Sequence, residues 1–211
     1  LDKKFYLPVV HKVEDYRGRV TYNGAPAAGR TVTLRYWNGL SYSDWATTTT
    51  DAGGNYVFYY KNLPPVGGGL HFYVRWTNDS QTPGYLTGWY CNDVIYDPAD
   101  NYVCNMDIGD ISLGSPPGQA RIYPPYTFTW TRRPVTTDNY QVEFFNAIFE
   151  PLTPPNPSVG YTGEWTMTSL PDNMAVGPQY WWSVRADGPN GYGEAFYLKS
   201  FFFDDPNANP S

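Results

Sequence analysis

Alternation between apolar and polar residues constrains this chain more than any other feature, and it is clearest in the first third of the sequence. Residues 20–22 and 32–34 each place apolar side chains at every second position, which is the pattern of strands buried on one face. Turn-forming residues fill 23–29 between them, and a second turn at 51–55 leads into an apolar strand at 56–58. These segments predict short strands joined by tight turns.

The spacing of glycine, proline, aromatic and Thr-Asp positions across this region is distinctive. The positions are Gly18, Gly24, Pro26, Gly29, Thr50, Asp51, Gly54, Tyr56 and Phe58. The pattern resembles the carboxypeptidase regulatory-like domain, a small prealbumin-type β-sandwich related to collagen-adhesin B-type repeats. The resemblance implies a secreted scaffold or binding module. Collagen-adhesin domains often carry a Lys–Asn isopeptide bond, but Lys61 is the one lysine between residues 15 and 115, so we expect none here.

A second strand pattern begins after residue 118. Trp130 closes one strand, and Tyr180, Trp182 and Val184 alternate in another that precedes the turn Asp187-Gly188-Pro189-Asn190-Gly191. Residues 119–203 therefore resemble a fibronectin type III domain. The resemblance implies that Trp130 lies in the core and that the domain has no active site of its own.

These patterns predict an all-β chain of two tandem Ig-like or prealbumin-like β-sandwiches with an extended N-terminal arm. Glycine and proline number 20 each, aromatic residues reach 18%, and no segment has the pattern of a helix of three turns. The predicted units are a strand-like arm at 1–12, a sandwich at 13–114, a Pro/Gly linker at 115–118, a second sandwich at 119–203 and a tail at 204–211.

Charge and hydropathy exclude two classes of partner. The net charge of −6 and the lack of a basic stripe argue against nucleic acid. No window of about 18 apolar residues is present, so we expect no membrane span. The chain begins at Leu1 rather than methionine, which fits a secreted product after removal of a signal peptide.

The two cysteines point to the same compartment. Cys91 and Cys104 flank a turn-rich stretch, and two cysteines in an aromatic β-rich chain favour an extracellular disulfide over two buried thiols. Because the segment from Thr77 to Val103 is long for a connection, we predict a loop there that the disulfide closes. Such a bridge contributes on the order of 3 kcal/mol.

Few residues offer catalytic chemistry. His11 and His71 stand in unrelated contexts, without a nucleophile or further ligands beside them. Glu143 and Glu164 lie in predicted strands, where alternation points them to solvent rather than across a cleft. We therefore expect no enzyme and no cofactor.

Calcium is the one metal that the sequence leaves open. Five aspartates cluster in and after the cysteine loop: Asp93, Asp97, Asp100, Asp107 and Asp110. Carboxylates in a loop can hold calcium, but the regular spacing of a calcium loop is lacking, so a solvated loop is the default interpretation.

Large aromatic residues are more numerous in the first sandwich than one core of that size buries. We predict an aromatic contact surface, for protein or for sugar, from Trp37, Tyr42, Trp45, Trp89 and Tyr90. The segment from Trp37 to Trp45 has the pattern of a hairpin with aromatic residues at its tip.

The arm supplies the leading hypothesis for function. Phe5, Leu7 and Val9 share one face of an apolar, strand-like segment, which either pairs with its own sandwich or completes the sheet of a neighbour. Addition in trans is open-ended and makes filaments. The sequence thus favours a non-enzymatic cell-surface protein whose partner is a second copy of itself. The alternative is an adhesion or carbohydrate-binding module that takes a glycan or a host or cell-surface ligand.

Overall fold

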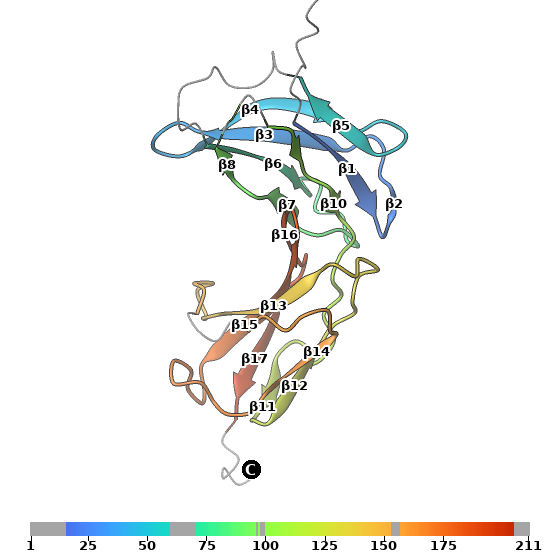
Figure 1. Cartoon of the computed structure of the whole chain (residues 1–211). Helices are drawn as coiled ribbons and strands as arrows, with labels where there is room; N and C mark the ends of the chain where they lie inside the picture. Colours follow the sequence, from blue (N-terminus) through green and yellow to red (C-terminus); the bar gives the residue numbers. More distant parts are fainter. Residues whose placement is uncertain (1–15, 60–70, 96, 98–99, 153–156, 205–211) are drawn as a thin grey trace, which may run out of the picture.

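The computed structural model describes residues 16–59, 71–95, 97, 100–152 and 157–204 (Figure 1). These residues form seventeen strands and no helix, which confirms the all-β prediction. No helix among them is long and apolar enough to cross a membrane. The predicted donor residues Phe5, Leu7 and Val9, His11 and most of the C-terminal tail lie outside the described residues.

A five-stranded sheet, here called the small sheet, is built around β1 (Tyr16–Tyr22). Along one edge β1 pairs antiparallel with β5 (Asn55–Phe58) and β2 (Ala25–Pro26). Along the other edge it pairs parallel with β9 (Tyr102–Val103) and β10 (Met106–Asp107). Both edges of β1 are therefore occupied.

A ten-stranded sheet, here called the shared sheet, runs through both predicted sandwiches (Figure 1). Its first part contains β3 (Thr31–Trp37), β4 (Tyr42–Thr49), β6 (His71–Thr77), β7 (Gly88–Cys91) and β8 (Val94–Ile95). Its second part contains β11 (Ala120–Ile122), β13 (Asn139–Phe145), β15 (Gln179–Gly188), β16 (Gly191–Glu194) and β17 (Lys199–Phe203). A separate pair, β12 (Tyr126–Thr129) with β14 (Glu164–Met167), covers the second part.

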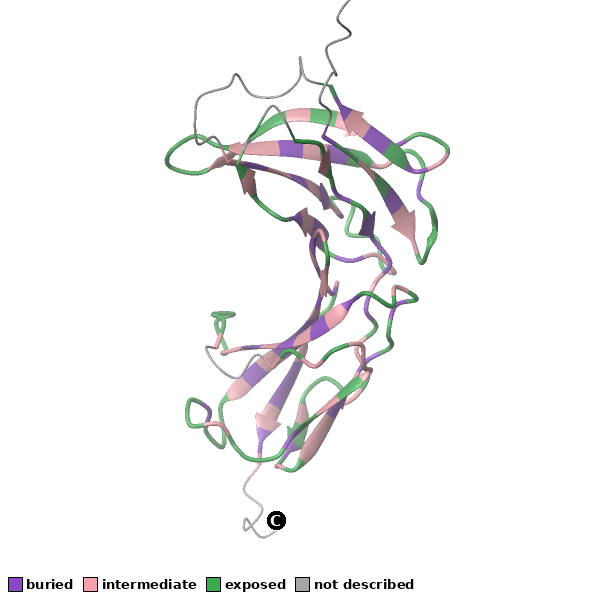
Figure 2. Cartoon of the chain, viewed as in Figure 1, coloured by how far each residue is buried: buried purple, intermediate pink, exposed green. Residues whose placement is uncertain are grey.

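Alternating burial explains why these segments are strands. In β6, Phe72, Val74 and Trp76 are buried while the residues between them are half-buried (Figure 2). Phe72 packs edge-on against Tyr16 of the small sheet, with ring centroids 5.6 Å apart. In the second half, Phe128 of β12 packs on Phe144 and Trp182 across the sandwich. Rings from facing sheets thus fill each core.

Several sequence predictions hold in this region. Trp130 is buried, and Tyr180, Trp182 and Val184 are buried along β15, just before the last hairpin. The division of the chain at residues 115–118 stays a prediction.

The segment from Thr77 to Val103 differs from the prediction. It is not one long connecting loop, because β7, β8 and β9 lie within it. These strands are two to four residues long, so they carry too few alternating positions to be recognised in the sequence. The short strand β16 escapes prediction for the same reason.

Candidate functional site

The two halves of the shared sheet meet where β7 pairs with β16, and we call this pairing the seam. Four residue pairs form it in antiparallel register, from Gly191 with Cys91 to Glu194 with Gly88. Glycine at position 193 makes the close approach feasible. A Cβ at that position would lie 2.5 Å from Cδ1 of Leu86 and 2.6 Å from Cε3 of Trp89. The sequence Gly191-Tyr192-Gly193 is thus adapted to a strand that must meet a second module.

A buried arginine lies beside the seam. Arg133, from the second half of the chain, contacts the carboxylate of Asp138 at 2.7 Å, and both side chains are fully buried. Its guanidinium also donates to the backbone carbonyls of Asp107 and Gly109, which belong to the first half. The same group lies over the ring of Trp89, 5.2 Å from the centroid. These contacts join the two halves.

The second half of the chain also binds the residues that come just before the predicted linker. Nζ of Lys199 donates to the backbone carbonyls of Leu113 and Gly114, at 2.7 and 2.8 Å. The amide of Phe196 donates to Asp110 at 2.9 Å. The two modules therefore meet through strand pairing, buried charge and hydrogen bonds, rather than through a chain connection alone.

Four tyrosines converge on the outer face of the shared sheet at the seam, and we call this site the tyrosine pocket. Tyr42 comes from β4, Tyr73 from β6, Tyr90 from β7 and Tyr192 from β16. They line a cavity of about 300 Å³ together with Cys91, Asn92 and Asp93. One of the four rings belongs to the second half of the chain, so the pocket is complete only when the seam is formed.

Neighbouring rings and cations hold the tyrosines in place. Tyr90 and Tyr192 stack across the seam with centroids 5.2 Å apart, and Tyr42 meets Tyr73 edge-on at 4.8 Å. Nη1 of Arg35 donates to the hydroxyl of Tyr73 at 2.9 Å. In the second half of the chain, the guanidinium of Arg185 lies 4.8 Å from the ring centroid of Tyr192. All four rings are half-buried, which leaves one part of each accessible to a ligand.

Burial keeps the phenol groups protonated. It raises the pKa of Tyr42 to about 12, with a further contribution from the hydrogen bond of its hydroxyl to Asp93. Burial also raises the pKa of Tyr90 and Tyr192, and the charge of Glu194 adds to the effect in both. The hydroxyls of these three tyrosines therefore stay neutral hydrogen-bonding groups near pH 7 and do not become phenolate nucleophiles.

One carboxylate lies at the rim of the pocket. Asp93 accepts from Tyr42, and its Oδ2 lies 2.8 Å from Nδ1 of His71. The side chains of both Asp93 and His71 are about 40% exposed, so the rim faces solvent. The pocket thus combines aromatic faces with amide, carboxylate and hydroxyl groups.

The structure places the residues of the predicted aromatic surface at different positions. Tyr42 and Tyr90 line the pocket, and Trp37 packs edge-on against Tyr42. Trp45 packs on Tyr36 and does not line the pocket. Trp89 was wrongly placed on this surface, because it is 2% exposed and lies under the seam against Gly193.

Two of the four pocket tyrosines, Tyr73 and Tyr192, were not among the residues predicted for the aromatic surface. Tyr73 alternates with buried residues in β6, so the strand pattern predicts that its side chain points outward. Tyr192 lies a hundred residues or more away from each of the other three in the chain. Only the pairing of β16 with β7 brings it there.

The disulfide Cys91–Cys104 is confirmed, with Cα atoms 6.1 Å apart. It connects β7 of the shared sheet to the segment between β9 and β10 of the small sheet. The bridge therefore joins the two layers of the first sandwich.

The five aspartates of the calcium hypothesis do not converge. Among the residues that the structure describes, no three acidic, histidine or cysteine side chains are placed to hold a metal ion. Asp107 instead accepts from Thr21 and the amide of Gly24, both at 2.7 Å. Asp110 binds the amide of Phe196 across the interface.

Glu143 also differs from the prediction of a solvated side chain. It is 17% exposed, lies 3.6 Å from Arg185, and burial together with the charges of Glu194 and Asp187 raises its pKa to about 7. It does not line the tyrosine pocket. The raised pKa of Glu143 results from its burial in a cluster of charged residues on β13, β15 and β16.

Comparison with known proteins gives distant structural similarities. No family model matches the chain, and no curated protein matches it in sequence. The crystal structure of the chicken CNTN1 FN1–FN3 domains is similar at 10% identity and a TM-score of 0.34, over 91% of this chain and 64% of that one. A tetra-tandem repeat in the extending region of a large adhesion protein is similar at 14% and 0.27, over 90% and 49%.

A third similar structure is the Bacillus anthracis TIE protein, at 11% identity and a TM-score of 0.30, over 92% of this chain and 31% of that one. The chain spans less than two thirds of each of these three structures. Similarity this distant says nothing about a ligand. The resemblance of the first half to carboxypeptidase regulatory-like domains stays a prediction.

Proposed function

We propose that this chain is a non-enzymatic extracellular binding protein, and that its tyrosine pocket holds a sugar unit of a neutral glycan. The observation that carries the proposal is the convergence of four half-buried tyrosines on one cavity at the seam. A tyrosine offers both a ring face and a hydroxyl. A sugar ring offers matching groups, a patch of C–H bonds and several hydroxyls.

The size and surroundings of the pocket support a small ligand unit. A cavity of about 300 Å³ is at the lower end of the range for ligand sites. Asn92 and Asp93 at the rim supply hydrogen-bonding groups that fix the orientation of a bound sugar. The disulfide supports an extracellular location, because such bonds persist in oxidising compartments.

Binding fits the pocket better than hydrolysis does. Glycosidases generally use two carboxylates on either side of the bond that they cleave. Asp93 is the one carboxylate among the described residues that line this pocket. Tyr42, Tyr90 and Tyr192 are protonated near pH 7, so they are not activated nucleophiles either.

A glycan array followed by titration calorimetry tests the proposal. We expect the unaltered chain to bind a neutral glycan. The affinity should fall about tenfold or more in Tyr90→Ala and in Tyr192→Ala, because tyrosine is enriched among the residues that carry most of the binding energy of a surface. Tyr192→Phe keeps the ring and retains most of the affinity. Tyr197→Ala, at an exposed position outside the pocket, is the matched control. Absence of neutral glycans among the bound ligands, or equal affinity in the pocket variants and the control, would contradict the proposal.

Self-assembly into an extracellular filament by strand addition of the N-terminal arm is a second candidate function. What favours it is strand β4, which has eight residues and pairs along one edge with β3, but with no other described strand. An unpaired edge of this length can accept a strand from another chain. Phe5, Leu7 and Val9 would form the donor face.

Electron microscopy of the full chain beside a version that lacks residues 1–12 tests this second function. Filaments from the full chain that vanish on truncation are the expected result. Monomers in both samples would contradict assembly by the arm.

A further inference from the structure

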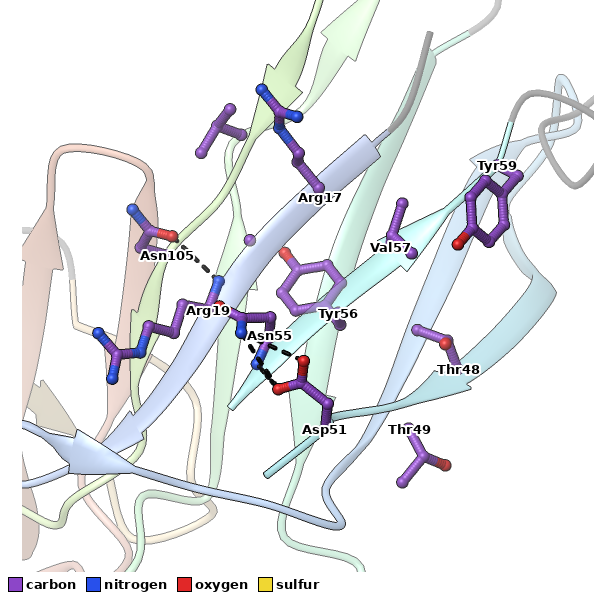
Figure 3. Close-up of a pocket in the computed structure, with 12 residues that line it drawn as sticks. Arg17, Arg19, Thr48, Thr49, Asp51, Asn55, Tyr56, Val57, Tyr59 and Asn105 are labelled. Carbon is purple, nitrogen blue, oxygen red and sulfur yellow. Dashed lines mark hydrogen bonds between the residues drawn. The ribbon is translucent and has the colours of Figure 1, made fainter. Parts of the chain in front are cut away.

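A second cavity lies on the outer face of the small sheet, away from the tyrosine pocket. Its volume is about 720 Å³, and it extends over β1, β5 and β9 to the end of β4 (Figure 3). None of the residues that line it also lines the tyrosine pocket. We call it the arginine groove, because Arg17 and Arg19 extend from its central strand.

Strand pairing arranges the floor of the groove in two rows. Arg17 pairs with Val57 on one side and with Val103 on the other, so the first row has a cation between two apolar side chains. Arg19 pairs with Asn55, and its backbone amide donates to Asn105 at 3.0 Å. The second row therefore has a cation between two amides.

Arg17 and Arg19 are alternate residues of β1, so their Cα atoms lie about 7 Å apart along the strand. Arg17 forms no ion pair with any described residue. Arg19 donates through Nε to the carbonyl of Gly53 at 3.0 Å. These contacts leave positive charge without a carboxylate partner, on a chain whose net charge is −6.

Asp51, the one acidic side chain among the described residues that line the groove, is already engaged. Its Oδ1 accepts from the amides of Gly53 and Asn55, at 2.9 and 2.8 Å. The hydrogen bonds to Asn55 and Gly53, with help from the charge of Arg19, lower the pKa of this carboxyl. Asp51 therefore shapes the turn at the end of the groove while the arginines face solvent.

We propose that the arginine groove binds a carboxylate-bearing polysaccharide, a chain that contains uronic acids. Guanidinium groups bind carboxylates with two parallel hydrogen bonds, which matches the acidic group of such a sugar. Asn55, Asn105 and the exposed Thr49 supply partners for ring hydroxyls. The ring of Tyr59, which is 51% exposed, supplies a face for a sugar ring.

An acidic peptide fits the groove less well. Extended peptides gain much of their affinity from main-chain hydrogen bonds to a free strand edge. Both edges of β1 are already paired, so a ligand over Arg17 and Arg19 meets side chains alone. Amides and hydroxyls beside the cations favour a ligand with many hydroxyl groups.

Titration of the full chain with polygalacturonate fragments at low salt, beside a neutral galactan of similar length, tests the proposal. We expect the acidic polymer to bind, and to bind at least tenfold more weakly to the double variant Arg17→Gln/Arg19→Gln. Affinity should also fall with rising salt. Arg132→Gln, which removes an exposed cation stacked over Tyr161, is the matched control and should change affinity less than twofold.

Three results would overturn this proposal: no binding of polygalacturonate by the unaltered chain, equal affinity in the double variant, or equally tight binding of poly-glutamate at the same site. Circular dichroism verifies that the double variant is folded, and both substituted side chains are exposed. Tyr90→Ala should bind polygalacturonate normally. The arginine groove and the tyrosine pocket can therefore fail independently.

Discussion

The tyrosine pocket and the arginine groove lie on opposite layers of the same sandwich, but they are built in different ways. The groove is formed within the first half of the chain, from neighbouring strands of the small sheet. The pocket needs Tyr192 from the second half, which the seam brings against Tyr90. A binding site formed within one module is independent of how modules pack, whereas a site across a seam depends on it.

The disulfide links the two sites. Cys91 lines the tyrosine pocket, and Cys104 lies between Val103 and Asn105, which line the arginine groove. The sandwich is therefore cross-linked between its two candidate binding surfaces.

The largest expected loss of stability comes from a substitution beside the seam, where Arg133 is buried, rather than from one in the groove. Arg133→Ala removes the partner of the buried Asp138, so we expect the free energy of unfolding to fall by about 3–5 kcal/mol. Urea denaturation measures it. Arg132→Ala, at the exposed neighbouring position, should stay within about 0.5 kcal/mol of the unaltered chain. Equal stability of the two variants would mean that the buried Arg133–Asp138 pair does not stabilise the fold.

Removal of the disulfide tests the link between the two sites. The double variant Cys91→Ser/Cys104→Ser should lose about 3 kcal/mol of stability, because the unfolded chain is no longer constrained by the closed loop. The midpoint of urea denaturation, compared with that of the oxidised chain, measures the loss. An unchanged midpoint would show that the two layers do not depend on the bridge.

The sequence predicts features that depend on residues close together in the chain, and it misses those that depend on residues far apart. Alternation within one strand identified β3, β6, β13 and β15, and the resemblance to fibronectin type III domains placed Trp130 in the core. The disulfide followed from composition and compartment. Trp89 was misplaced because the sequence shows that a residue is aromatic, but not which face of a short strand it occupies.

The seam lies beyond what local patterns can predict. The two strands β7 and β16 have four residues each, and three of those eight residues are glycines. Their partners are about a hundred residues apart in the chain. A pattern read along the chain contains no information about a pairing at that distance, so Tyr192 was not predicted to join the tyrosine pocket.

The smallest of these stability effects depends on pH and concerns the second half of the shared sheet. Burial and like charges raise the pKa of Glu143 to about 7, so the folded chain holds this proton more tightly than the unfolded chain. Stability should therefore fall by about 1–3 kcal/mol as pH rises from about 4.5 to 7, and Glu143→Gln should remove this part of the fall. Thermal denaturation across that range measures it, with the exposed Glu164→Gln as control. Identical pH profiles for Glu143→Gln and the unaltered chain would contradict the shift.

The most direct test of the account is paired titration of Gly193→Val with the neutral glycan and with polygalacturonate. A side chain at position 193 meets Leu86 and Trp89, so β16 must move away from β7 and carry Tyr192 with it. Gly118→Val, at a position with open space around it, is the control. We predict at least a tenfold loss of neutral-glycan affinity and less than a twofold change for polygalacturonate. Unchanged neutral-glycan affinity in a folded Gly193→Val variant would contradict a pocket built across the seam.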